Sequence, residues 1–156
     1  MHVDLAGSEE IEATQQELWV GLNDPDVLTK CIPGCQSMTE TGPDQYHVEM
    51  QLKVAAVGGS FDGTIGLSEK TPPEHCRITV SGEGTLGTGS GTAQFTIVET
   101  GAETCRLDYS GEGEIGGLVA GVGQRILGSV SKHLTKQFFK DLRKHFAEKR
   151  QSAGAS

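Results

Sequence analysis

Apolar and polar residues alternate along much of the chain, which is the pattern of strands that bury one face. The first such run extends from Val3 to Ile11. Further alternating runs cover residues 46–56, 61–67, 76–80, 93–97 and 105–109. Segments rich in glycine or proline separate these runs, so we predict an antiparallel meander with one face exposed to solvent.

Two short helices are predicted between the first strand and the meander. Thr14-Gln15-Gln16-Glu17 has the spacing of a capping box, in which the Thr hydroxyl and the Glu carboxylate each bind a free helix amide. We expect this helix to extend through Leu22. Asn23-Asp24-Pro25 begins a second helix, with a capping side chain ahead of a proline in the first turn. Pro33-Gly34 ends it.

A single long helical pattern follows the meander, from about Leu118 to Ala147, with no later strand to pair with. A half-apolar sheet followed by one terminal helix indicates an α+β fold in which the helix lies across a curved antiparallel sheet. Such an arrangement tends to enclose a cavity. We expect one domain over residues 1–150, and a disordered polar tail over residues 151–156.

Apolar residues recur at every fourth position along this helix. They are Leu118, Val122, Ile126, Val130, Leu134, Phe138, Leu142 and Phe146. Each step of four residues rotates the apolar stripe by about 40°, so a straight helix cannot bury all of it against one sheet. We expect the first half, which contains Gly117, Gly121, Gly123 and Gly128, to lie close to the sheet. The second half would turn Phe138, Leu142 and Phe146 away from the sheet. These side chains would contact a membrane or a partner, or they would be covered by the short helices or by a dimer mate.

Charge is distributed unevenly along the chain. The net charge is −8, but residues 1–123 carry −14 and residues 124–156 carry +6. The acidic body argues against general nucleic-acid binding, which favours a basic face on the domain. Lys132, Lys136, Lys140, Arg143 and Lys144 lie roughly opposite the apolar strip of the helix, and they form a candidate docking surface for an acidic partner or an anionic bilayer. A solvated helix face is the simpler alternative.

Several other function classes find little support in the sequence. The residues at the N-terminus do not resemble a signal peptide, and no run is apolar enough to span a bilayer, so we expect a cytoplasmic protein with reduced thiols. Cys31 and Cys35 lack the spacing and partners of a zinc site. Two G-x-G-x-x-G matches, at Gly82 and Gly111, lack the strand–turn–helix–strand context of a nucleotide site. No buried carboxylate can be named, because nearly every Asp and Glu falls at a solvent-facing position or in a turn, and this argues against acid–base catalysis.

The segment Trp19-Val-Gly-Leu-Asn-Asp-Pro-Asp-Val-Leu-Thr-Lys-Cys-Ile-Pro-Gly-Cys35 resembles the CoxG family of carbon monoxide dehydrogenase subunits, within the SRPBCC/START-like superfamily. The two Ser-Gly-Glu-Gly strand ends and Gln137-Phe138-Phe139 are also similar to that family. The resemblance covers about residues 3–147. It implies a helix-grip fold, in which a curved seven-stranded antiparallel sheet wraps around a long C-terminal helix and two short helices close one end.

The resemblance also implies an accessory, non-enzymatic role. CoxG proteins accompany molybdenum hydroxylases of the carbon monoxide dehydrogenase type and are thought to link them to the membrane and its quinones. The implied ligand is a hydrophobic small molecule, plausibly a quinone or lipid, with no other cofactor and no metal. Many members carry a hydrophobic C-terminal extension, whereas residues 151–156 are small and polar, so we expect at most reversible, peripheral contact with the inner face of the plasma membrane.

We expect the ligand to lie in a cavity between sheet and helix. The predicted lining is Trp19, Leu28, Ile32, Met50, Phe61, Phe95, Tyr109, Val122, Ile126 and Leu134. Two alternatives remain open. One is an enzyme of the superfamily, such as a polyketide cyclase or aromatase, with Tyr46 or Tyr109 facing the cavity. The other is a structural subunit whose core is filled.

Overall fold

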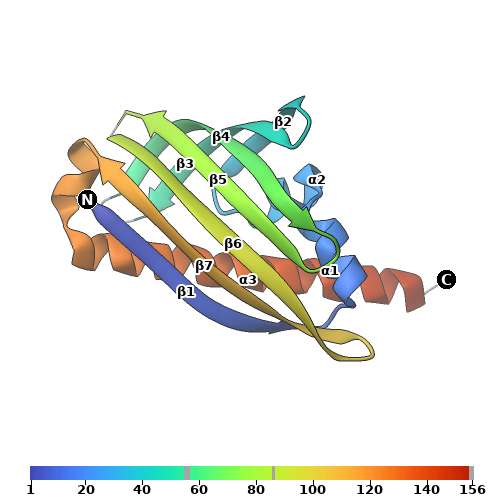
Figure 1. Cartoon of the computed structure of the whole chain (residues 1–156). Coiled ribbons are helices and arrows are strands. Elements are labelled where there is room, and N and C mark those ends of the chain that lie inside the picture. Colours follow the sequence, from blue (N-terminus) through green and yellow to red (C-terminus); the bar gives the residue numbers. More distant parts are fainter. Residues whose placement is uncertain (55–56, 86, 155–156) are drawn as a thin grey trace.

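The computed structural model describes residues 1–54, 57–85 and 87–154. Its sheet has seven antiparallel strands in the order β1-β7-β6-β5-β4-β3-β2 (Figure 1). The strands are β1 (His2–Ile11), β2 (Cys35–Gly42), β3 (Gln45–Val54), β4 (Val57–Thr71), β5 (His75–Gly84), β6 (Gly87–Gly101) and β7 (Thr104–Gly116). The first strand returns to pair with the last, and the others form the predicted meander. The predicted fold class is confirmed.

Strand β2 is the element that alternation alone did not predict. Its sequence, Cys-Gln-Ser-Met-Thr-Glu-Thr-Gly, contains little apolar periodicity, and only the family resemblance implied a seventh strand. Its register against β3 shifts twice, between Cys35 and Ser37 and again between Glu40 and Gly42. None of its residues is fully buried, so the strand presents little apolar surface to the core.

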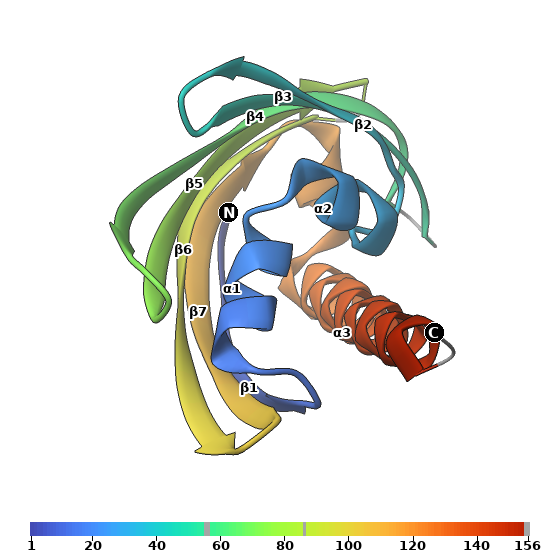
Figure 2. The same cartoon turned by 90° about the vertical axis from the view of Figure 1, so that its right-hand side faces the viewer.

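Both predicted caps position the short helices. Helix α1 (Gln15–Leu22) begins with the full capping box, in which Thr14 accepts from the Glu17 amide and Glu17 accepts from the Thr14 amide. Helix α2 (Pro25–Cys31) is capped by Asp24, which accepts from the Asp26 amide. Figure 2 shows both helices on the concave side of the sheet, beside the terminal helix.

The terminal helix is interrupted, which corrects the prediction of one continuous helix from Leu118. A short 3-10 helix η1 (Leu118–Val122) is followed by Gly123, which ends it. Gly123 has a φ of 89°, which glycine adopts without strain and other residues do not. Helix α3 (Gln124–Gly154) then crosses the concave face (Figure 2). It continues through residues 151–154, where we expected a polar tail, and residues 155–156 lie outside the described part of the chain.

The glycines of this region do not hold the helix close to the sheet, as the sequence had suggested. A Cβ added at Gly121, Gly123 or Gly128 would meet nothing within 4 Å. Gly117 and Gly123 are instead required by their positive φ angles at the two ends of η1. A Cβ at Gly128 would project into open space, so no close contact with the sheet requires a glycine there.

The core forms two separate apolar clusters. The larger one joins α1, α2 and the second half of α3 to one end of the sheet, through residues such as Leu18, Trp19, Phe95, Leu107 and Leu142. The smaller one joins η1 and the first half of α3 to the other end through Val119, Leu127 and Val130. Helix α3 is therefore fixed at both ends.

The apolar strip on the second half of α3 is covered within the molecule. Leu142 is 0% exposed and Phe146 is 2% exposed, and both belong to the larger cluster with the short helices. A Cβ at Gly21 of α1 would lie 3.0 Å from the Phe146 ring, so these helices approach closely. Of the alternatives left open by the sequence, coverage by the short helices is the one observed.

Candidate ligand-binding site

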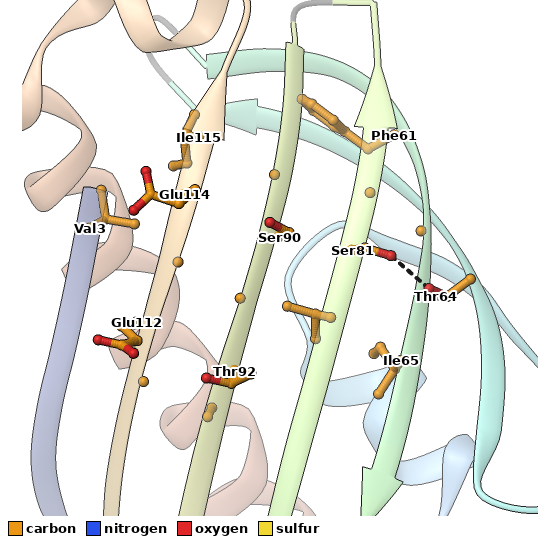
Figure 3. Close-up of a pocket in the computed structure, with 18 of the residues that line it drawn as sticks. Val3, Phe61, Thr64, Ile65, Ser81, Ser90, Thr92, Glu112, Glu114 and Ile115 are labelled. Atoms are coloured by element: carbon orange, nitrogen blue, oxygen red, sulfur yellow. Dashed lines mark hydrogen bonds between the residues drawn. The ribbon is translucent and has the colours of Figure 1, made fainter. Parts of the chain in front are cut away.

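A cavity of about 570 Å³ lies between the two apolar clusters (Figure 3). The inner faces of β1 and of β3 to β7 form most of its wall. Ile32, which follows α2, and Ser131 of α3 complete it. Val80 faces this space and is 40% exposed, so the cavity is open to solvent.

The floor of the cavity is made of glycine and one alanine. The inward positions of β4 to β7 carry large side chains where they enter the larger cluster, such as Phe95 and Leu107. Further along the same strands these positions are occupied by small residues. They are Gly63, Gly82, Gly89, Gly91, Ala93, Gly111 and Gly113.

The strand register brings these glycines together. Gly63 pairs with Gly82, and Gly82 pairs with Gly89. In the adjacent row Gly91 pairs with Gly113. Because neighbouring strands are about 4.8 Å apart, the paired glycines remove side chains from one continuous area of the inner face. The cavity is the space that those side chains would otherwise fill.

Three of the floor glycines cannot be replaced without moving the backbone. A Cβ would lie 2.6 Å from the Ser81 carbonyl oxygen at Gly63, 2.5 Å from that of Glu112 at Gly91, and 2.7 Å from that of Ser90 at Gly113. Gly89 is different, since its Cβ would lie 3.9 Å from the nearest atom, the Glu114 oxygen. A side chain at Gly89 could therefore enter the cavity without backbone strain.

The charged residues near the cavity direct their side chains away from it. Asp62, Glu112 and Glu114 alternate with inward-facing glycines, so their side chains lie on the convex face. Their side chains are 70%, 68% and 65% exposed, respectively. Glu114 binds His2 on that face, which lowers the pKa of Glu114 and raises that of His2. Asp62, Glu112 and Glu114 therefore contribute only their backbone atoms to the cavity wall.

The ten residues predicted to line the cavity fall in several places. Ile32, Met50 and Phe61 do line it. Trp19, Phe95 and Tyr109 lie in or against the larger cluster, where Trp19 and Phe95 have ring centroids 6.1 Å apart. Val122 and Leu134 pack against the smaller cluster, and Leu134 also lines a separate groove beside Pro33 and Gln51. Leu28 is half-buried in α2 away from the cavity, and Ile126 is 41% exposed.

Sequence reasoning missed the glycine floor and Ser131. The predicted set favoured large apolar side chains, which fill the ends of the structure and leave the middle empty. The sequence did contain a signal for the floor. Gly63 and the glycines of the two Ser-Gly-Glu-Gly segments occupy the same alternate positions as the apolar residues of their strands. Knowing that these glycines lie side by side requires the strand register.

The predicted docking residues divide into two groups. Lys132, Lys136, Lys140 and Lys144 are exposed along the outer side of α3 and are termed the basic strip. The ion pairs found among the described residues do not involve them. Arg143 is held within the molecule instead, because its guanidinium pairs with Glu9 and donates to the Glu10 carbonyl. The basic strip faces away from the cavity.

The buried thiols are poorly suited to act as thiolates. Burial raises the pKa of Cys31 to about 11 and that of Cys105 to about 11, and it also raises the pKa of Cys35 and Cys76. A metal ligand or nucleophile needs the deprotonated form. Within residues 1–54, 57–85 and 87–154, no group of three or more His, Cys, Asp or Glu side chains is placed to hold a metal ion.

The tyrosines considered for catalysis lie in the core. Tyr46 is buried in the larger cluster, and Tyr109 stacks on Phe139 with ring centroids 5.1 Å apart. Burial is the main cause that raises the pKa of both phenols. Neither residue belongs to the cavity wall. In the described wall, no two titratable side chains converge on the cavity.

This architecture, with a curved sheet around one long helix and an apolar cavity between them, defines a helix-grip protein of the START type. Residues 7–147 match the CoxG family of carbon monoxide dehydrogenase subunits. The chain therefore belongs to the CoxG family. No curated protein matches its sequence. Among the described helices, none combines the length and apolar character needed to cross a bilayer.

Solved structures extend this comparison. A conserved protein from Geobacillus kaustophilus is 38% identical, with a TM-score of 0.91 over 94% of this chain and 96% of that one. A START superfamily protein from Mycobacterium smegmatis is 14% identical, with a TM-score of 0.75 over 95% and 99% of the two chains. The Zhui aromatase/cyclase from Streptomyces sp. R1128 is 12% identical, with the same TM-score over 99% of both. The last two share the fold, which therefore occurs in an enzyme as well.

Proposed function

We propose that this protein is a non-enzymatic accessory protein that binds an apolar small molecule in the glycine-floored cavity. The observation that carries the proposal is the apolar gap of about 570 Å³ between two packed clusters. Ligand pockets commonly have volumes of roughly 300–1,000 Å³ and mostly apolar walls. The alternative of a filled structural core does not account for this gap.

The ligand class follows from the wall. Met50, Phe61, Ile65 and Ile115 provide apolar contacts around a flat floor of backbone. Burial of apolar surface contributes roughly 25 cal/mol per Å², whereas a charged group would lose its hydration without finding a partner here. A lipid or a quinone fits these conditions and is the ligand class of this proposal.

Native mass spectrometry tests this proposal directly. We expect gently ionised protein to carry an additional mass that organic extraction removes, because an open apolar cavity should retain a hydrophobic molecule during purification. The extracted protein should then take up an added quinone or fatty acid. Detection of only the bare polypeptide, together with no uptake by the extracted protein, would contradict the proposal.

Family membership suggests the partner. The CoxG description names a subunit of carbon monoxide dehydrogenase, and we propose that this chain assists a molybdenum hydroxylase of that type and helps to couple or recruit it to the membrane. The basic strip supports this proposal, since it gathers four exposed lysines on one side of an otherwise acidic molecule. Such a surface favours an acidic protein face or an anionic bilayer.

Charge reversal tests the docking surface. We expect Lys136→Glu/Lys140→Glu to weaken binding to the partner enzyme or to anionic liposomes by about tenfold or more, because two attractive charges become repulsive. Added salt should weaken binding of the unmodified protein as well. Binding can be measured by co-sedimentation with liposomes and by surface plasmon resonance with the enzyme.

The matched control is Lys53→Glu/Lys149→Glu. It changes the net charge equally at two exposed lysines outside the basic strip. An equal loss in both double variants would mean that overall charge, rather than the strip, governs binding. Unchanged binding in the Lys136/Lys140 variant would leave the basic strip as a solvated helix face.

The enzyme alternative has weaker support. It rests on the shared fold of the aromatase/cyclase, which is 12% identical. General acid–base catalysis requires a titratable group within reach of the reacting atoms. The described cavity wall offers glycine, aliphatic and aromatic groups with one serine from α3, so ligand binding accounts for it better than catalysis.

A further inference from the structure

Ser131 occupies an unusual position on α3. It lies one turn from Leu127 and close to one turn from Leu134, and both of these side chains belong to or pack against the smaller apolar cluster. Further along the same side, Phe138 and Leu142 enter the larger cluster. Ser131 is thus a polar residue in the middle of the sheet-facing side of the helix, at the gap between the clusters, where it lines the cavity.

The floor opposite Ser131 has no free polar group to offer a ligand. Strands β4 to β7 are each paired on both sides, and their registers are continuous through the glycine rows. Their backbone amides and carbonyls are therefore used within the sheet. The hydroxyl and carboxylate side chains that alternate with the glycines lie on the convex face.

The Ser131 hydroxyl has no partner of its own among the described hydrogen bonds. Thr135, one turn later, provides the contrast, because its hydroxyl donates to the Ser131 carbonyl at 2.8 Å. The helix thus satisfies the Thr135 hydroxyl internally and leaves that of Ser131 available. A serine hydroxyl can donate one hydrogen bond and accept others.

We propose that Ser131 is the specificity residue of the cavity and binds an oxygen atom of an otherwise apolar ligand. This inference rests on the proposed ligand-binding function and narrows its ligand class to apolar molecules that carry a carbonyl or hydroxyl group. A pure hydrocarbon would leave the serine hydroxyl without a partner, whereas a ligand oxygen would satisfy it. The single polar contact also fixes which end of the ligand lies beside α3.

A pair of probes that differ by one oxygen tests the proposal. Undecan-2-one and undecane have the same number of carbon atoms, and each can be measured by displacement of the fluorophore N-phenyl-1-naphthylamine from the extracted protein. Unmodified protein should prefer the ketone. Ser131→Ala should reduce ketone affinity by about three- to tenfold, the range of one hydrogen bond, and leave undecane affinity unchanged or slightly higher.

Two variants serve as controls. Ser131→Thr keeps a hydroxyl and should retain the preference for the ketone. Thr135→Val removes a hydroxyl that is already bonded within the helix, and it should not alter the preference. If Ser131→Ala lost affinity equally for the ketone and for undecane while it still bound the fluorophore, the proposed role of Ser131 would be overturned. The ligand-binding function would not be affected by that result. Failure of the fluorophore and both probes to bind unmodified protein would overturn this role and the ligand-binding function together.

Discussion

Gly89→Phe should abolish uptake of apolar ligands while the protein remains folded. Gly89 lies in the floor of the cavity on an interior strand, and a Cβ there would have no atom closer than 3.9 Å. An aromatic side chain suits a strand, and at this position it would occupy the space of the ligand. We expect affinity for N-phenyl-1-naphthylamine to fall by about a hundredfold, equivalent to about 2.7 kcal/mol.

The neighbouring substitution Ser90→Phe is the matched control. It places the same ring one residue further along β6, where alternation directs the side chain to the convex face and Ser90 is exposed. Circular dichroism and thermal unfolding should show that both variants fold. Retained binding in a folded Gly89→Phe protein would mean that the ligand does not occupy this cavity.

Leu142→Ala should cause a large loss of stability. Leu142 is 0% exposed and contributes to the larger apolar cluster together with α1 and α2. Truncation of a buried leucine to alanine typically costs about 2–5 kcal/mol, because contacts are lost and a void is left. Urea unfolding followed by circular dichroism measures this change as a lower midpoint with a similar slope.

Ile126→Ala is the control for this substitution. Both residues belong to the apolar stripe of the terminal helix, but Ile126 is 41% exposed on the first turns of α3. Its truncation should cost less than about 1 kcal/mol. A small effect at Leu142 would indicate that the second half of α3 is not fixed by the short helices, and the apolar strip would again be a candidate surface for a membrane or partner.

Local patterns predicted most elements because their causes are local. Alternation identified six strands, and the capping residues Thr14 and Asp24 placed the starts of both short helices. The same reasoning failed at β2, which has few apolar residues and none that is fully buried. It also failed at Gly123, because an apolar period that continues through a glycine does not reveal the positive φ that separates η1 from α3.

The candidate site was harder to predict than the fold. Large apolar residues were expected to line the cavity, but Trp19, Phe95 and Tyr109 pack on one another and on α3 instead. An apolar side chain contributes most where it is fully enclosed, so the largest ones gather at the packed ends. The cavity arises where small residues meet across the strands, and composition alone cannot show which ones meet.

The sequence by itself determined six of the seven strands with their inward parity, the caps of the short helices and the separation of an acidic body from a basic end. These properties depend on residues close together in the chain. The tertiary structure decided that Phe138, Leu142 and Phe146 are covered from within, that Arg143 is paired with Glu9, and that the glycines align into a floor opposite Ser131. Each of these depends on residues that are distant in sequence and meet only after strand register and helix position are fixed.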